Sequence, residues 1–453
     1  MKTDNLISTL KAAKRNAKMV PELARVSYGA ATRKFISEGR PLPIGTAIPA
    51  PPRPYRPESS RVPVQVMTPA GGHYMTTFFD IDPVSPSGRY LAVTKVPFIW
   101  RIPYVGDPAQ VVVIDLLEGT ATPIYTTRGW GAQLGANVQW GADDDTLYCN
   151  DVIEGRATGV ALERSTGKAR VLGGPIYGLS PDRKISLSGR IDYVNAGIPG
   201  YGVPEGLLHR PRQPHAENPE DGIWRTDLET GKSELFLSIA DIVSALPGQE
   251  GLKGGTYYVF NVKVNAQGTR GFAVLFTRKI PGRPGWPPQL VTFDMDGSNI
   301  RLAMSDARWR IGGHHPSWLP DGDHIIMNLR DKKQPMAFVK FRYDGENIET
   351  LAPGQKGGGH PTLNPQLTHL LTDAYTSERD FVDDAGDVPI RCIDLASAED
   401  QPLTRVNTRK LDGPRRIDPH PVWTDQGRKV IFNGIIDGYR QVLMADTSGL
   451  AEG

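Results

Sequence analysis

Trp318-Leu319-Pro320-Asp321-Gly322-Asp323-His324-Ile325 is the clearest copy of the phrase that decides the fold. An apolar or aromatic residue leads into turn-forming residues, and a short run of strand-forming residues follows. Comparable phrases occur seven times, at residues 85–91, 140–147, 180–185, 265–270, 318–325, 364–370 and 423–430. Each is typical of a hairpin turn that joins two strands. A unit that returns every 40 to 60 residues or so, about the length of a propeller blade, indicates a ring of repeats.

A second phrase interleaves with the first, an apolar strand that ends in Asp and a Gly turn, as in Phe293-Asp294-Met295-Asp296-Gly297. It also occurs seven times, at residues 113–116, 162–167, 224–231, 293–297, 341–345, 392–395 and 444–446, although some copies lack the Asp or the Gly. Two hairpins per repeat make a four-stranded antiparallel blade. The sequence therefore predicts an all-β fold, a seven-bladed β-propeller, in which residues 198–221 are an insertion loop.

The first 61 residues have a different character. Residues 1–40 carry nine Lys or Arg against three Asp or Glu, and apolar residues recur there at helical spacing, which predicts a short amphipathic helix. Residues 41–61 are rich in proline and are expected to form an extended linker. We therefore divide the chain into an N-terminal helix and linker (1–61) and the propeller (62–453), with residues 62–66 closing the ring against the last blade. The helix would pack on the ring or on a second subunit of a homo-oligomer; a targeting or membrane-surface role is the alternative.

Composition narrows the class of protein. The net charge of +2 provides no general attraction to nucleic acid. No apolar stretch approaches 18 residues, so no integral membrane segment is expected. The N-terminus lacks the apolar core of a secretory signal, which predicts a cytoplasmic protein. Cys149 and Cys392 are expected to be buried thiols, with one bridge between distant blades as the alternative.

The histidines indicate where function would lie. Four of the nine, His73, His315, His360 and His420, precede hairpin turns, and His314 adjoins the second of them. Equivalent positions in a ring converge on one axis, so these side chains would meet although they are far apart in sequence. A single such histidine would more often be a satisfied core residue, but the repeated placement favours a functional cluster. The remaining ones, His209, His215, His324 and His369, are expected to be structural or at the surface.

A metal site is expected at the end of the chain. Asp418 and His420 are two residues apart, so in a strand they lie on one face. Together with His360 they would form a nitrogen and oxygen site for a divalent ion such as Mn, Zn or Ca. For Asp418, capping of a turn is the alternative role. Two further sets are candidates for substrate contact: Tyr375, which follows Asp373 in the blade of His360, and the basic pair Arg415 and Arg416.

Trp130 and Gln133 precede the second blade turn, with Asn137, Gln139 and Trp140 close behind. Amides that bind hydroxyls and an indole that stacks on a sugar face are typical of carbohydrate contacts. Packing between blades is the alternative.

The C-terminal half resembles oligogalacturonate lyases in His315-Pro316-Ser317-Trp318-Leu319-Pro320-Asp321-Gly322, in Gly359-His360 and in Asp418-Pro419-His420-Pro421. That family consists of seven-bladed propellers with a catalytic histidine and a divalent ion, usually Mn. The resemblance implies that His315 is catalytic and that His360 and His420 bind the metal. Asp418 stands where the family has the first His of a His-Pro-His-Pro phrase, and Arg415 stands near the place of a Gln ligand.

The N-terminal half resembles propeller-type ulvan lyases. The similarity lies in Gly72-His73-Tyr74, in residues 80–91, 130–140 and 175–177, and in Asp221-Gly222-Ile223. At Val259-Phe260-Asn261-Val262 the chain has Asn261 where many relatives would have histidines. The two resemblances together cover most of the ring.

The sequence thus predicts a carbon–oxygen lyase that cleaves a uronate-containing oligosaccharide or polysaccharide by β-elimination. His315 would transfer a proton, and His73 and Tyr74 are candidates for the second proton transfer or for substrate contact, as is His314 for substrate binding. The alternative is a non-catalytic TolB-like propeller that binds a ligand or a protein. A peptidase-type propeller would need a Gly-x-Ser-x-Gly motif, which is absent, and no carboxylate pair diagnostic of a glycosidase is found.

Overall fold

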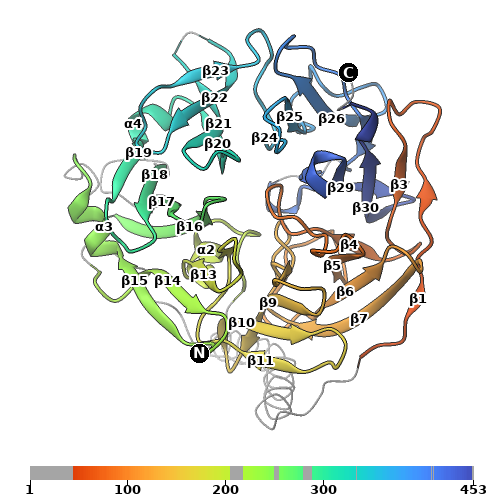
Figure 1. Ribbon diagram of the computed structural model, residues 1–453, viewed down its shortest axis with the longest axis horizontal. Helices are drawn as coiled ribbons and strands as arrows, with labels where there is room; N and C mark the ends of the chain where they lie inside the picture. The colour runs from red at the N-terminus through yellow and green to blue at the C-terminus, as the bar shows by residue number, and fades with distance from the viewer. Residues whose placement is uncertain are drawn as a thin grey trace, which may run out of the picture.

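The computed structural model describes residues 44–204, 218–248, 255–278, 288–332, 334–409, 411 and 413–450. These residues form seven antiparallel sheets arranged round one axis, in sequence order (Figure 1). The predicted all-β, seven-bladed propeller is therefore confirmed. The predicted N-terminal helix, His209 and His215 lie outside the described residues.

Every blade has at least four strands, which are named from the axis outward. Blade one consists of β4 (His73–Met75), β5 (Tyr90–Val96), β6 (Ala109–Asp115) and β7 (Thr120–Thr127). Blade two consists of β8 (Gln139–Trp140), β9 (Thr146–Ile153), β10 (Arg156–Glu163) and β11 (Ala169–Val171). Blade three consists of β12 (Gly178–Leu179), β13 (Ile185–Ser188), β14 (Gly222–Asp227) and β15 (Ser233–Ser238). Blade four consists of β16 (Thr256–Val264), β17 (Arg270–Arg278), β18 (Pro288–Asp294) and β19 (Arg301–Met304). Blade five consists of β20 (Gly313–Trp318), β21 (His324–Arg330), β22 (Met336–Arg342) and β23 (Glu349–Leu351). Blade six consists of β24 (Thr362–Leu363), β25 (His369–Thr372), β26 (Asp387–Asp394) and β27 (Thr404–Asn407). Blade seven consists of β28 (Val422–Thr424), β29 (Lys429–Ile436), β30 (Tyr439–Asp446) and β3 (Val64–Val66).

The ring is closed by the N-terminal segment, as the sequence predicts. Strand β3 pairs with β30, with Val64 opposite Ala445 and Val66 opposite Leu443. The proline-rich segment before it is extended, and it also adds edge strands: β2 (Arg53–Pro54) pairs with β3, and β1 (Ile48–Pro49) pairs with β7. Proline is tolerated there because an edge strand leaves one side of its backbone unpaired.

The turn phrase is stabilised by hydrogen bonds to its own side chains and by the backbone conformation of its glycine. The Asp321 carboxylate accepts hydrogen bonds from the backbone N–H groups of Asp323 and His324, both at 3.0 Å. Gly322 has a φ of 72°, in the left-handed region that glycine adopts without strain. This turn chemistry explains why the phrase marks the blades in the sequence.

Apolar cores lie between adjacent blades. One cluster joins Val111 and Val113 of blade one to Trp140, Cys149 and Val160 of blade two. Cys149 and Cys392 are both buried and free, in agreement with the expectation of thiols. Short helices lie in connections: α2 (Ile191–Gly197), α3 (Ile239–Ala245), α4 (Asp306–Trp309), η2 (Gly413–Arg415), η3 (Asp425–Gly427) and η4 (Ser448–Leu450). In the described part of the chain, no helix is long and apolar enough to cross a membrane.

The strand order gives the ring two distinct faces. Because consecutive strands are antiparallel, the crossovers between blades and the loops from second to third strands emerge on one side, which we call the crossover face. The remaining hairpins, including the turn phrase, emerge on the other side, the hairpin face. The residues that lead into each innermost strand lie on the crossover face.

Candidate functional site

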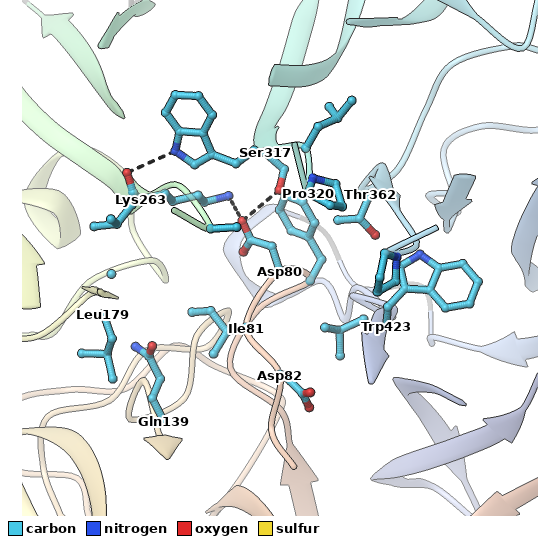
Figure 2. Close-up of a pocket in the computed structure, with 18 of the residues that line it drawn as sticks. Asp80, Ile81, Asp82, Gln139, Leu179, Lys263, Ser317, Pro320, Thr362 and Trp423 are labelled. Carbon is cyan, nitrogen blue, oxygen red and sulfur yellow. Dashed lines mark hydrogen bonds and ion pairs between the residues drawn. The ribbon is translucent and has the colours of Figure 1, made fainter. Parts of the chain in front are cut away.

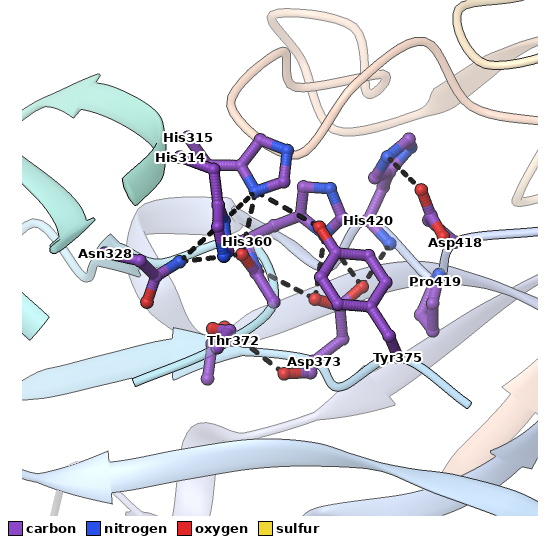
Figure 3. Close-up of polar contacts among 12 residues, drawn as sticks. His314, His315, Asn328, His360, Thr372, Asp373, Tyr375, Asp418, Pro419 and His420 are labelled. Carbon is purple, nitrogen blue, oxygen red and sulfur yellow. Dashed lines mark hydrogen bonds and ion pairs between the residues drawn. The ribbon is translucent and has the colours of Figure 1, made fainter. Parts of the chain in front are cut away.

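Four histidines from three neighbouring blades meet near the axis on the crossover face (Figure 3). His314 and His315 lie in β20, His360 precedes β24 and His420 precedes β28. The ring centroids of His315 and His360 are 4.0 Å apart, and those of His360 and His420 are 4.3 Å apart. The structure thus brings together three of the four histidines that precede turns, and adds His314.

His73 lies apart from this cluster. Its ring contacts Tyr439, with centroids 5.4 Å apart, and its Nδ1 accepts a hydrogen bond from the backbone N–H of Arg440 at 3.1 Å. Within the described residues, no ring contact joins His73 to the other histidines. Blade one instead presents Phe78 and Phe79, whose rings pack against His315, His360 and His420.

Left-handed backbone bends aim the imidazoles at the axis. His315 has a φ of 58° and His420 a φ of 47°, a conformation that costs free energy in a non-glycine residue. Gly359, with a φ of 60°, makes the bend before His360. A Cβ at Gly359 would lie 2.1 Å from the Asp373 carbonyl oxygen, so a side chain there would require the hairpin to move. In blade four, Asn261 has the same bend, with a φ of 55°.

Asp373 organises two of the histidines. The Nδ1 of His360 lies 2.8 and 3.0 Å from the two carboxylate oxygens of Asp373, and therefore donates its proton to them. The backbone N–H groups of His360 and His420 also donate to this carboxylate, at 2.9 and 3.1 Å. A carboxylate that fixes the Nδ1 proton leaves Nε2 with a free lone pair, the arrangement typical of metal-binding histidines.

The predicted metal ligands form a compact, buried group. His360, Asp418 and His420 each offer a ligand atom, and these atoms lie within 4.8 Å of one another. Among the described residues, His360 Nε2 and both ring nitrogens of His420 have no hydrogen-bond partner. Buried polar atoms without partners are costly, and a divalent ion would satisfy them. Two imidazoles and one carboxylate suit Mn or Zn, so the donor set fits such an ion.

Arg416 holds the carboxylate of this group. Its Nε lies 3.1 and 2.8 Å from the two oxygens of Asp418, and its Nη2 donates to the hydroxyl of Tyr201. Burial raises the pKa of Asp418, and the charge of Arg416 opposes that rise. The guanidinium of Arg416 is therefore occupied by its ion pair with Asp418, whereas Arg415 is exposed in η2.

The contacts of His315 define its tautomer (Figure 3). Its Nδ1 lies 2.9 Å from the carbonyl oxygen of Gly359, which can only accept, so Nδ1 carries the proton and Nε2 the lone pair. Burial, followed by the charges of His360 and His314, holds the pKa of His315 well below its ordinary value. The hydroxyl of Tyr375 lies 3.3 Å from the same Nδ1. Burial raises the pKa of this phenol well above 10, so it keeps its proton.

The other predicted site residues lie in packed surroundings. Tyr74 is 1% exposed and belongs to the core between blades one and seven. Trp130 is also 1% exposed, and its indole N–H donates to the Asp107 carbonyl oxygen at 2.8 Å, an arrangement of packing between blades. Gln133 donates to the carbonyl oxygens of Arg416 (2.8 Å) and Pro414 (3.2 Å), and so holds the loop of Asp418. His324 and His369 lie in hairpins beside Asp321 and Asp394, as expected.

Of two further residues at the candidate site, Asp373 had a signal in the sequence and Tyr201 had none. The register of blade six pairs Thr362 with Leu371, and two more steps set His360 opposite Asp373. The position of the Asp373 carboxylate opposite His360 could therefore have been predicted from the turn of this hairpin. Tyr201 lies in the segment interpreted as an insertion loop, and no local pattern links it to Arg416.

Each face of the ring has a cavity of its own. On the crossover face, a cavity of about 310 Å³ is lined by Tyr375, Arg409, Arg416 and Asp418, among others. Two of these residues, Tyr375 and Asp418, border the histidine cluster. On the hairpin face, a cavity of about 500 Å³ is lined by residues of all seven blades (Figure 2). At its inner end, Lys263 of blade four pairs with Asp80 of blade one beside Ser317.

Fold and site together define a seven-bladed β-propeller with a buried His and Asp centre on its axis. No family model matches the chain, and no curated protein matches it. Among solved structures, the chain is similar to an oligogalacturonate lyase in complex with manganese, at 17% identity over 89% of this chain and 97% of that chain, with a TM-score of 0.62. It is also similar to the oligogalacturonate lyase of Vibrio parahaemolyticus, at 15% identity over 89% and 98% of the two chains, with a TM-score of 0.60. At these identities the likeness shows the fold.

The donor set makes a direct prediction about metal content. Protein equilibrated with Mn²⁺ or Zn²⁺ and then gel-filtered is expected to retain about one ion per chain, and His420→Ala to retain almost none, because an imidazole ligand is lost. Mass spectrometry of the metal measures both. His324→Ala, on the opposite face, is the control and should keep the wild-type content. Equal ion content in His420→Ala and the wild type would assign the ion to another place.

Proposed function

We propose that this protein is a carbon–oxygen lyase that cleaves a uronate-containing glycan by β-elimination at the histidine cluster. The observation that carries the proposal is the position of a neutral His315, with a free Nε2, against a buried group made of Asp418 and histidine nitrogens that lack hydrogen bonds. Elimination at a uronate requires neutralisation of the C5 carboxylate, a base for the C5 proton and an acid for the departing C4 oxygen.

These needs can be assigned to residues. His315 accepts the C5 proton at Nε2, since its Nδ1 already donates to Gly359. Tyr375 donates its phenolic proton to the departing oxygen; it is a better candidate than His73 or Tyr74 because its hydroxyl lies beside His315. A divalent ion held by His360, His420 and Asp418 would supply positive charge for the substrate carboxylate.

Arginines at the crossover face support binding of an acidic sugar. Arg409 lines the cavity beside the cluster and is exposed, as is Arg415 in the neighbouring η2. Because Arg416 is bound to Asp418 and Tyr201, its role in the proposal is to position Asp418. Arg409 and Arg415 then provide the charge that attracts the uronate.

The test is an ultraviolet assay for the unsaturated uronate that β-elimination creates. Polygalacturonate, alginate, glucuronoxylan and their short fragments would be offered with Mn²⁺, Zn²⁺, Ca²⁺ or EDTA. We expect absorbance to rise with one substrate class and EDTA to suppress the rise. Metal-loaded, folded protein that produces no absorbance with any of these glycans, but binds one of them, would instead support the binding propeller.

A further inference from the structure

The loop that joins β5 to β6 in blade one carries two unusually exposed aromatic side chains. Trp100 is 63% exposed and Tyr104 is 62% exposed, whereas the next most exposed large aromatic side chain of the described residues, Tyr439, is 40% exposed. Exposed aromatic rings that are not packed away have a cost in water and often mark a binding surface. These two rings therefore require an explanation.

The loop holds both rings in fixed positions. The guanidinium carbon of Arg101 lies 3.7 Å from the ring centroid of Phe98, 4.6 Å from that of Tyr104 and 5.3 Å from that of Trp100. Arg101 Nη1 in turn pairs with the buried Asp107 carboxylate at 2.5 Å. The same carboxylate oxygen accepts a hydrogen bond from the backbone N–H of Tyr104 at 2.7 Å. Rings held in place in this way lose little entropy when a ligand stacks on them.

This loop belongs to the face that carries the site. Loops from second to third strands emerge on the crossover face, as do the crossovers with the histidines. The connection is also physical: Ile99 and Trp130 share one apolar cluster with Ile417, and Leu411 packs against that cluster. Ile417 and Leu411 line the 310 Å³ cavity beside Asp418. A shared apolar core therefore connects this cavity to the loop that carries Trp100 and Tyr104.

We propose that Trp100 and Tyr104 form a platform on which pyranose rings of a glycan chain stack, outside the reacting subsite. Flat aromatic faces with a polar edge suit the apolar face and hydroxyl rim of a sugar. A protein partner would require a wider apolar patch, but here Arg101 separates the two rings, and Ile99 and Pro103 are buried. The ligand class rests on the proposed function, and it implies that the enzyme prefers long chains over short fragments.

The experiment compares Trp100→Ala and Tyr104→Ala with the wild type in affinity electrophoresis through gels that contain polygalacturonate, alginate or glucuronoxylan. We expect each change to weaken retardation by the recognised polymer about tenfold, the loss typical of one stacking contact. Trp100→Phe should recover most of it. Leu117→Ala is the matched control, because Leu117 is 75% exposed in the same blade but lies on the hairpin face. Turnover of a short fragment should stay at the wild-type value in all four variants.

The outcomes separate the two proposals. Retardation that depends on Trp100, without any lyase product, would retain the platform and overturn the lyase. Lyase turnover with equal polymer affinity in Trp100→Ala and Leu117→Ala would overturn the platform alone. A loss of self-association in Trp100→Ala, measured by sedimentation, together with unchanged polymer affinity, would assign the surface to contact between copies of the chain and overturn the platform.

Discussion

His315→Ala is expected to reduce turnover by about 10²- to 10⁴-fold, the usual contribution of a general acid or base. The imidazole is neutral because burial keeps its pKa low, and the Gly359 carbonyl fixes its proton on Nδ1. Alanine removes the free Nε2 but leaves the proposed metal ligands His360 and His420 in place. The loss should therefore appear in kcat, with the metal content of the wild type retained.

Two controls make this expectation specific. His324→Ala removes an imidazole from a hairpin on the opposite face, where it pairs with Asp321, and should keep full turnover. The circular dichroism spectrum of His315→Ala should match that of the wild type. Its melting temperature is expected to be lower, because alanine keeps the left-handed φ of this position and loses the packing of the imidazole. Unchanged turnover in a folded His315→Ala would remove His315 from the mechanism.

The fold was predictable because its signals are local and repeated. A turn such as 318–325 is stabilised by its own Asp321 and Gly322, so the turn of each blade can be recognised from the local sequence. Ring closure by residues 62–66 followed from the need to complete the last blade, and β3 fulfils it.

The site was predictable only where ring symmetry applies. His315, His360 and His420 occupy matching positions before the turns of consecutive blades, so their convergence follows from the repeat. His73 lies much further before its turn, and the chain continues past it to Phe78 before it reaches the axis. Trp130 could not be placed from its sequence position. A tryptophan there suits a sugar contact, but only the structure shows that the indole is buried between blades.

Asp80→Ala is expected to lower the free energy of unfolding by about 3–5 kcal/mol, the cost of leaving a buried charge without its partner. Lys263 and Asp80 pair across the axis and join blades four and one (Figure 2). Lys263 also donates to the Pro316 carbonyl oxygen at 3.0 Å, next to His315. Burial lowers the pKa of Lys263, and Asp80 opposes that effect. Without Asp80 the pKa of this ammonium falls further below that of the unfolded chain.

The sign of the pH dependence follows from this shift. When the pKa of Lys263 is lower in the folded than in the unfolded chain, the unfolded chain binds more protons, so stability rises with pH until the unfolded pKa is passed. Asp80→Ala should therefore lose more stability at pH 7 than at pH 9.5 in urea unfolding. The double variant Asp80→Ala with Lys263→Met buries neither charge and should recover most of the loss. If the losses of unfolding free energy of the two single substitutions instead add in the double variant, Lys263 and Asp80 are not energetically coupled. The lower stability of Asp80→Ala would then come from lost packing beneath Phe79.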